Sequence, residues 1–309
     1  MTWFNRRTVA PIVLLVVGAL LAYFFVPRFG TRINIGYFLL QSVPLLLTAV
    51  GQTLVIITAG IDLSVGATIS LTSNFASGWI DGDPNMVVPV VVGVVALGAT
   101  LGCLNGALSH YLKVHPLIVT LGMASILQGC TLLYSLAPVG KVTDDFEAFA
   151  YGRIFGLSYG FLAMLALFAL VGLFLHRTRT GNAIYVVGGD PRGARLLGIS
   201  VARTMMLAYA LSGACAALTA VYLVSRMGSG DPWRGDGFDL ASITPVVVGG
   251  TALSGGRGGP LGTLLGVFLI SLLNNILNFL DVSTFYQWIV QGLIIITAVA
   301  IHVEKGRRV

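Results

Sequence analysis

Long uninterrupted apolar runs constrain this chain more than any other feature of its sequence. A helix needs about 20 apolar residues to cross the hydrocarbon core of a membrane. Runs of about that length follow one another along the sequence, at residues 9–27, 33–58, 62–80, 86–109, 116–137, 155–175, 204–225, 240–256, 259–280 and 285–303. The sequence therefore predicts an all-α polytopic membrane protein with about ten transmembrane helices, forming a single domain over residues 1–309.

The composition agrees with this fold class and excludes others. Only 10% of the residues are charged, whereas soluble domains carry about a quarter. No basic run with interleaved aromatic residues occurs, so the net charge of +6 predicts no nucleic-acid partner. The cysteines Cys103, Cys130 and Cys215 lie inside apolar runs without metal-ligand spacing. We therefore expect neither a disulfide set nor a metal site.

The distribution of charge predicts the orientation in the membrane. An even number of spans places both termini on one side. With a cytoplasmic N-terminus, 12 of the 18 lysines and arginines fall on the cytoplasmic side, as the positive-inside rule requires, and nine of the 12 acids fall outside. Arg6 and Arg7 precede the first run, but no small-residue cleavage site follows it, so we expect an uncleaved first span.

The charged segment 176–203 lies near the middle of the chain, on the predicted cytoplasmic side. Its centre has the start and stop signals of a short helix over Pro191–Leu197. Asp190 suits the N-cap, Pro191 suits the first helical position, and Gly198 suits the left-handed residue just past the end. The sequence predicts a short capped helix at this place.

This helix is expected to lie against another surface. Leu196 and Leu197 offer apolar contacts, and Arg192 and Arg195 are exposed cations. Two helical turns are marginal alone in water. The helix is therefore predicted to rest on the rest of the chain or on a partner, and a solvated basic loop is the alternative.

Two segments on the predicted outer side are long enough to carry structure. Residues 138–154 are acidic enough to meet a water-soluble partner. Residues 226–239 place Trp233 and Phe238 for the membrane interface or for a docking protein. Ordinary solvated loops are the alternative for both segments.

Glycines at four-residue spacing occur twice, at Gly98-Gly102-Gly106 and at Gly258-Gly262-Gly266. The two runs are five spans apart, so the two copies would cross the membrane in opposite directions. That arrangement is typical of inverted-topology repeats in transporters. Coincidence is the alternative in a chain with 39 glycines.

Asp62 is an ionisable residue between two apolar runs, which is a functional-site hypothesis by default. It could line a transport path or take up a proton. Alternatively, Asp62 and Ser64 could cap the third helix, with Gly60 and Gly66 allowing a tight break. The spacing favours capping.

Polar side chains recur on the predicted spans. Gln41, Thr48 and Gln52 are spaced seven and four residues apart, so they share a face of the second helix, and Asn274 and Asn278 share a face of the ninth. Amides and hydroxyls inside a membrane either hydrogen-bond helix to helix or face a polar cavity. A set spread over several spans, with almost no buried charge, suits a neutral polyhydroxylated solute better than an ion. The candidate residues of a translocation path are Gln41, Gln52, Asp62, Ser64, Asn74, Asn105, Asn274 and Asn278.

The chain does not have the motifs of an enzyme. Leu253-Ser254-Gly255-Gly256 resembles the signature tetrad of ATP-binding cassette ATPases, but no G-x-x-x-x-G-K-[ST] loop is present to hold a phosphate. No serine or cysteine triad, metal cluster or dinucleotide fingerprint stands out. We expect no catalytic residue, no metal and no cofactor on this chain.

Four motifs in order resemble one family, the permease subunits of bacterial monosaccharide ATP-binding cassette importers of the ribose/xylose/arabinose/galactose group. The resemblance covers the chain from Gly51 to about Ile301. The motifs are Gly60–Gly66 (GIDLSVG), Thr120–Gly122 (TLG), Arg179–Pro191 (RTGNAIYVVGGDP) with Leu197–Ile199 (LGI), and Val247–Gly258 (VVGGTALSGGRG).

The resemblance implies a multi-pass protein of the bacterial inner membrane that pairs with a second permease copy or paralogue. Two cytoplasmic ATPases would carry ATP and magnesium, and a periplasmic sugar-binding protein would deliver the solute. The cytoplasmic helix becomes a coupling helix on the ATPase, with Asp190, Pro191, Arg192, Ala194, Arg195, Leu196, Leu197 and Gly198 as its contact residues. Two features depart from the family: Arg192-Gly193 replaces the alanines common there, and residues 138–154 match no family motif.

Two alternatives stay open. A permease for branched-chain amino acids or nucleosides shares the Asp62-Leu63-Ser64 region, although the Val247–Gly258 motif favours sugars. An ion-coupled secondary sugar carrier would need acids inside the membrane, and only Asp62 qualifies. Such a carrier would also leave the short cytoplasmic helix without a role.

Overall fold

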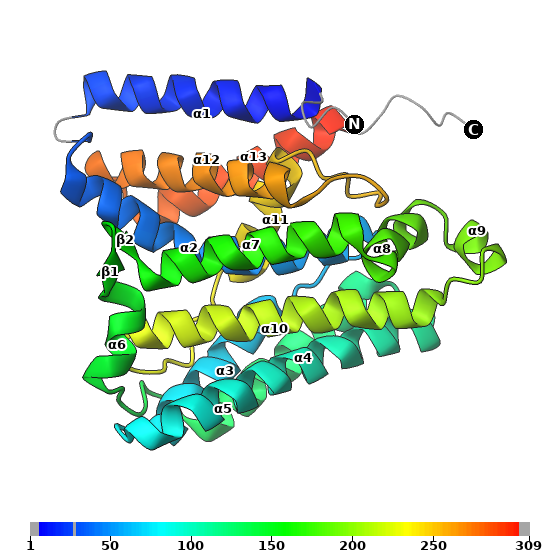
Figure 1. The fold of residues 1–309 in the computed structure, drawn as a ribbon, viewed down its shortest axis with the longest axis horizontal. Helices are drawn as coiled ribbons and strands as arrows, with labels where there is room; N and C mark the ends of the chain where they lie inside the picture. Colours follow the sequence, from blue (N-terminus) through cyan, green and yellow to red (C-terminus); the bar gives the residue numbers. More distant parts are fainter. Residues whose placement is uncertain (1–5, 27–28, 303–309) are drawn as a thin grey trace.

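The computed structural model describes residues 6–26 and 29–302, and most of its long helices run lengthwise along one bundle (Figure 1). The long helices are α1 (Arg6–Phe25), α2 (Arg32–Ile57), α3 (Val65–Ile80), α4 (Val87–Tyr111), α5 (Pro116–Tyr134), α7 (Tyr159–Arg177), α10 (Val201–Met227), α11 (Phe238–Val248), α12 (Pro260–Phe279) and α13 (Thr284–His302). The short elements are the 3-10 helix η1 (Pro84–Met86), α6 (Asp144–Tyr151), β1 (Arg153–Ile154), β2 (Leu157–Ser158), α8 (Arg179–Gly189) and α9 (Pro191–Leu196). The predicted all-α polytopic class is confirmed.

Each of the ten predicted runs overlaps one long helix. Six helical stretches are long and apolar enough to cross a membrane: α2, η1 with α4, α5, α7, α10 and α12. The count of ten spans therefore stays a prediction, and residues 27 and 303 of the predicted runs lie outside the described residues. The predicted bounds agree with the helices to within four residues except at the end of the eighth run, where α11 ends at Val248 rather than at residue 256.

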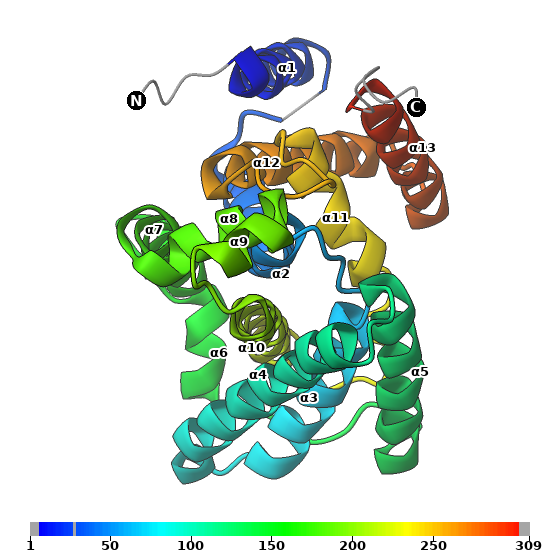
Figure 2. The same cartoon turned by 90° about the vertical axis from the view of Figure 1, so that its right-hand side faces the viewer.

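The helices α2 and α10 lie at the centre of the bundle, and α1, α5 and α13 lie at its edge (Figure 2). Hydroxyl groups join the two central helices: Tyr222 donates to the Leu40 carbonyl at 2.9 Å, and the Thr48 and Thr219 hydroxyls are 3.0 Å apart. Because an unpaired polar group inside a membrane is costly, these bonds fix the contact between the helices. α1 packs on α12.

The two glycine runs serve close helix packing. A Cβ at Gly102 would clash with the Tyr209 carbonyl on α10, so the glycines of α4 let its backbone touch that of α10. A Cβ at Gly266 would clash with the Pro245 carbonyl on α11. An inverted repeat five spans apart would relate the α4–α10 pair to α12 and α2, but the second glycine run faces α11. The runs therefore give no support to an inverted repeat.

The connection between α2 and α3 begins with a hydrogen-bonded helix end. The amide of Gly60 donates to the Val55 carbonyl at 3.1 Å, and that of Ala59 donates to the Ile56 carbonyl at 2.9 Å. This is a Schellman motif, whose left-handed position is usually a glycine. Here Ala59 occupies it with a φ of 63°.

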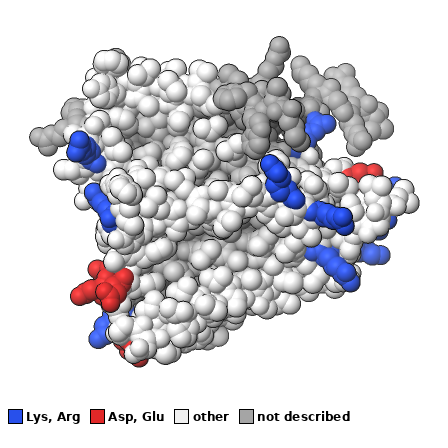
Figure 3. Space-filling model, in the orientation of Figure 1, with Lys and Arg blue, Asp and Glu red and all other residues white. Residues whose placement is uncertain are grey.

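The charges of the face shown in Figure 3 lie at the two ends of the bundle, with an uncharged band between them. Such a band is what a hydrocarbon layer requires. One end carries α8 and α9, and the other carries α6 and the β1–β2 hairpin (Figure 1). The expectation that residues 138–154 carry structure is confirmed, because α6 begins there after the N-cap Thr143.

The predicted outer loop 226–239 is in part wrong. Residues 228–237 are not helical, but the backbone of the segment packs along α3 while Trp233 and Asp236 stay exposed: a Cβ at Gly230 would clash with the backbone of Ser73 and Asn74, and one at Gly235 with that of Gly66. Glycines allow this contact because they add no side chain between two backbones.

Candidate functional site

The charged segment 176–203 contains two short helices, α8 and α9, where the sequence predicted one. α8 begins after the N-cap Thr178, whose hydroxyl accepts the Gly181 amide at 2.9 Å. Its apolar side chains Ile184 and Val187 are buried in the bundle. This burial, rather than helix propensity, explains a helix over a sequence rich in glycine.

The predicted short helix is present as α9, one residue shorter than expected. Asp190 Oδ1 accepts the Arg192 amide at 2.9 Å, Pro191 takes the first helical position, and Gly198 has a φ of 76°. Ala194 is fully buried and joins a small apolar cluster with Val187 and Val201. α9 is thus capped at both ends and fixed to α8 and α10 through one face.

The other face of α9 is uncovered. Leu196 is 90% exposed and Leu197 is 73% exposed, and Arg192 and Arg195 are exposed as well. α9 projects from the end of the bundle (Figure 1). Nothing among residues 6–26 and 29–302 covers the two leucines, so the described part of the chain is not the surface that was expected to receive them. Exposed leucines beside cations are typical of an interaction surface.

α8 is joined to the end of α2 by backbone contacts. The Ile57 carbonyl accepts the Gly256 amide at 2.8 Å, and a Cβ at Gly188 would clash with that same carbonyl. Tyr185 adds a bond from its hydroxyl to the Gly258 carbonyl at 3.0 Å, and burial raises the pKa of Tyr185. The loop that contains Gly256 therefore connects α8 to α2. The Leu253–Gly256 tetrad is part of this loop and has a structural role in it.

Asp62 is the centre of a buried polar cluster at the α2–α3 break. Its Oδ1 accepts the Ser64 amide at 3.0 Å and the Ser64 hydroxyl at 2.7 Å, and its Oδ2 accepts the Ser212 hydroxyl of α10 at 3.2 Å. Asn105 Nδ2 of α4 donates to the Ser64 hydroxyl at 2.8 Å. The capping interpretation was wrong for Asp62, because it accepts the amide of Ser64, the residue before α3, and no amide of the first turn of the helix. It was also wrong for Ser64, whose side chain makes no cap bond.

Gln52 and Asn74 are fully buried, and both side-chain polar atoms of each have no hydrogen-bond partner among the described residues. Asn105 Oδ1 is also buried without a hydrogen-bond partner among the described residues. A buried amide without partners is costly, and such groups concentrate at functional sites or at ordered water. These residues stay candidates for the path, but none of them lines the polar cavity that contains Gln41.

A polar cavity of about 320 Å³ lies between α2, α10, α11, α12 and α13. Its polar lining residues are Gln41, Arg226, Asp236, Ser271, Asn274, Gln287 and Gln291. Arg226 lies in the last turn of α10 and its carbonyl accepts the Tyr151 hydroxyl of α6, so the cavity is at the end of the bundle that carries α6. Amides and one charge of each sign make it a site for a small polar solute.

Two of the eight predicted path residues, Gln41 and Asn274, line this cavity. Asn278 accepts a bond from Gln287 at 2.7 Å and Asn274 one from Gln291 at 3.3 Å, so both asparagines face α13. Asp62, Ser64 and Asn105 form the separate buried cluster. The sequence analysis missed Gln287 and Gln291, although their four-residue spacing on one helix face is the signal that selected the asparagines.

No group of three or more His, Cys, Asp or Glu side chains that could hold a metal ion occurs among residues 6–26 and 29–302. Cys103, Cys130 and Cys215 are free thiols.

Residues 34–299 match the family described as the branched-chain amino acid transport system / permease component. The chain belongs to this family of membrane permeases. No solved structure matches it.

Several curated relatives match nearly full length. The chain is 37% identical over 306 residues to the ribose import permease protein RbsC of Escherichia coli strain K12, covering 97% of this chain and 94% of that protein. It is 34% identical over 274 residues to the D-allose transport system permease protein AlsC of the same strain, covering 88% and 84%. The galactose/methyl galactoside import permease protein MglC of Salmonella typhimurium strain LT2 is 34% identical over 328 residues, covering 100% and 97%.

Proposed function

We propose that this chain is the membrane-spanning subunit of an ATP-binding cassette importer for a monosaccharide of the ribose, allose or galactose type. The names of the nearly full-length relatives support the substrate class. ATP hydrolysis, with its magnesium, belongs to separate ATPase subunits, and a periplasmic sugar-binding protein delivers the sugar. The pore is completed by a second copy or a paralogue.

The single observation that carries the ATPase partner is the uncovered face of α9. Leu196 and Leu197 are exposed at the tip of a capped helix whose opposite face, at Ala194, is buried in the chain. Because one face of the helix is fixed to the bundle and the other can bind a partner, a movement of the partner would move the bundle as well. Closure of the ATPases on ATP would move α9 and rock the bundle between inward and outward access.

This assignment also gives the orientation. The end of the bundle with α8 and α9 faces the cytoplasm, and the end with α6 and the polar cavity faces the periplasm of a bacterial inner membrane. Both termini are then cytoplasmic, as the positive-inside count predicts. The cavity with Gln41 and Asn274 opens toward the binding protein.

One experiment tests the whole proposal. The tagged chain is purified gently from its native membrane, its companions are identified, and the complex is reconstituted in liposomes. We expect a co-purifying ATPase and ATP-dependent uptake of D-ribose, D-allose or D-galactose in the presence of the binding protein. A chain that arrives alone, without ATPase activity, would contradict the proposal in favour of an ion-coupled carrier.

A second candidate function is import of branched-chain amino acids, which the family description names. Arg226 and Asp236 line the same polar cavity, and one charge of each sign also suits a zwitterion. Uptake of L-leucine in the same liposomes separates the two functions. Uptake of leucine with no uptake of the three sugars would establish the second.

A further inference from the structure

The non-helical segment 228–237 reaches deep into the bundle. Gly230 packs at Ser73 and Gly235 packs at Gly66, both on α3. Because an α-helix rises about 1.5 Å per residue, these two positions lie about 10 Å and about 21 Å from Ile80 at the outer end of α3. The hydrocarbon core is about 30 Å thick, so the segment descends well past its outer boundary before α11 begins.

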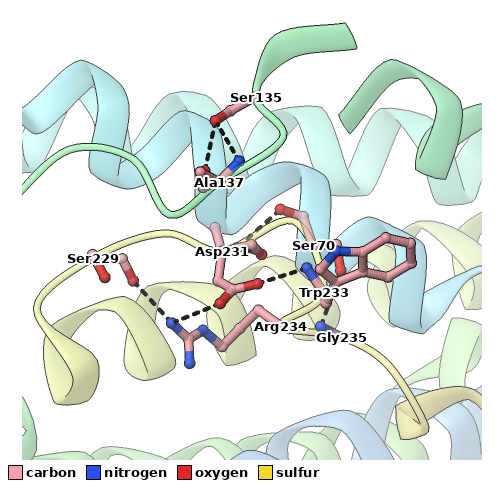
Figure 4. Close-up of polar contacts among 9 residues, drawn as sticks. Ser70, Ser135, Ala137, Ser229, Asp231, Trp233, Arg234 and Gly235 are labelled. Atoms are coloured by element: carbon pink, nitrogen blue, oxygen red, sulfur yellow. Dashed lines mark hydrogen bonds and ion pairs between the residues drawn. The ribbon is translucent and has the colours of Figure 1, made fainter. Parts of the chain in front are cut away.

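Side chains hold this re-entrant segment in place (Figure 4). The Gly235 amide donates to the Ser70 hydroxyl at 3.0 Å, and the Trp233 amide donates to Asp231 Oδ1 at 2.8 Å. Gln128 Nε2 of α5 donates to the Pro232 carbonyl at 3.1 Å. Irregular backbone at membrane depth is tolerated only where it is buried in protein or lines a water-filled cavity. This segment does both.

A second cavity, of about 160 Å³, lies between the re-entrant segment, α3 and α5. Its chemistry-bearing lining residues are Ser70, Gln128, Trp233, Asp236 and Asp239, and the rest of its wall is mostly glycine and alanine. Trp233 is 58% exposed. Asp236 lines both this cavity and the larger polar one, so the two adjoin at the re-entrant segment.

The two carboxylates are available to a ligand. Among the described residues, neither Asp236 nor Asp239 has a side-chain hydrogen bond or an ion pair, and the guanidinium of Arg234 pairs with Asp231 at 3.9 Å instead (Figure 4). Ionised carboxylates only accept hydrogen bonds, so they require a ligand that donates. They also repel an anion, which excludes phosphates and carboxylic acids as ligands.

One ligand class satisfies this set of groups. Sugar hydroxyls donate to carboxylates and to the Gln128 amide oxygen, while the apolar face of a sugar ring packs on an indole, which offers a large rigid surface. The cavity has room for several water molecules, whose places the hydroxyls of one sugar ring would take.

We propose that the cavity at the re-entrant segment is a transit site for one monosaccharide, with the ring against Trp233 and its hydroxyls on Asp236 and Asp239. The site rests on the proposed sugar-importer function and adds a contact point inside the permease itself. The sugar passes between the two cavities along Asp236, which both of them share.

Transport by the complete reconstituted importer tests the site. The measurement is sugar taken up per ATP hydrolysed, with D-ribose, D-allose and D-galactose each as probe. We expect Trp233→Ala to lower this ratio by about tenfold or more, since it removes the main apolar contact. Asp236→Asn retains an acceptor oxygen and lowers it by only about threefold.

Matched controls come from the same chain. Trp79→Ala removes another half-exposed tryptophan, which stacks on Phe75 of α3, and Asp145→Asn removes an exposed carboxylate of α6. Both variants are expected to transport like the wild type. Unchanged uptake in Trp233→Ala at normal protein levels, with uptake intact in the wild type, overturns the site and leaves the importer function standing.

Direct binding separates the site from the function. Saturation-transfer NMR of the full chain in nanodiscs, with each of the three sugars at millimolar concentration, is expected to show transfer in the wild type and in Trp79→Ala but not in Trp233→Ala. Transfer without any sugar transport contradicts the function and supports the site. Absence of transfer in the wild type overturns the site.

A divalent cation is the ligand that the two carboxylates would otherwise take. In that case EGTA and Asp236→Asn would each abolish uptake, and Trp233→Ala would retain it. That pattern overturns the sugar site.

Discussion

The helix α9 and the re-entrant segment 228–237 are both short and not hydrophobic enough to span a membrane, yet they are fixed in opposite ways. α9 is set by neighbours in the sequence, since the cap bond of Asp190 and the left-handed Gly198 lie within eight residues of each other. The re-entrant segment is set by contacts with α3 and α5, far away in the chain. Local signals define where α9 begins and ends, whereas only packing defines where the segment lies.

The largest expected effect comes from breaking the exposed face of α9. Arg195→Glu combined with Leu196→Glu should reduce ATP-driven uptake to background while the protein still inserts, because a carboxylate replaces an apolar contact at the proposed partner surface. Uptake and ATP hydrolysis are measured in liposomes.

The matched control places the same two changes at the other end of the bundle. Arg153→Glu with Ile154→Glu alters an exposed cation and an exposed apolar residue on β1. Wild-type uptake by the α9 double variant, or an equal loss in both variants, would sink the assignment of α9 as the ATPase contact.

A smaller effect is expected at the Asp62 cluster. Asp62→Leu leaves the Ser64 amide and two hydroxyls without an acceptor, and each such buried group is worth about 1–3 kcal/mol. Asp62→Asn keeps one acceptor oxygen and should destabilise by about 1 kcal/mol. Thermal unfolding in detergent and protein level in membranes measure the difference. Equal loss of transport by both variants at normal protein level would show that the charge of Asp62, rather than its hydrogen bonds to Ser64 and Ser212, is what transport requires.

The backbone contact between α8 and α2 offers a test with adjacent residues. Gly188→Ala puts a Cβ into the Ile57 carbonyl and should cost about 1–3 kcal/mol through overpacking. Gly189→Ala meets only the Gly256 Cα at 4.0 Å, which is ordinary contact. Melting temperatures of the two variants should therefore separate, and identical values would contradict the close approach.

The smallest effect is expected at the local cap of α9. Asp190→Ala should destabilise the helix by about 1 kcal/mol, and Asp190→Ser should restore most of it, because serine also caps. Hydrogen exchange of the α9 amides is the measurement. Unchanged exchange in Asp190→Ala would mean that packing of Ala194 alone holds the helix, and the contrast with the re-entrant segment would disappear.

The sequence predicted features that depend on local chemistry. The caps of α9, the all-α class and the shared face of Asn274 and Asn278 were correct, because each follows from residue type and spacing. α8 was missed because its glycines disfavour a helix, and the burial of Ile184 and Val187 overrides them. The descent of residues 228–237 was missed as well, because a composition of glycine, aspartate and arginine is equally that of a solvated loop.

The candidate path shows the same limit. Spacing selected amides on α2 and α12, but it could not tell that Gln41 lines a cavity while Gln52 is sealed inside the bundle. Which face of a central helix borders a cavity depends on the size of the side chains on the neighbouring helices. That information is spread over the whole chain.

The junction of α8 with α2 has a mechanical consequence. Gly188, Ile57 and Gly256 meet through backbone atoms, with no side chain between them whose rotamer could change. A contact of this kind is rigid. A small displacement of α8 therefore moves the end of α2 by nearly the same distance and at the same time. Close packing makes protein interiors nearly incompressible. A movement that the proposed ATPase partner imposes on α9 would therefore reach the centre of the bundle with little loss.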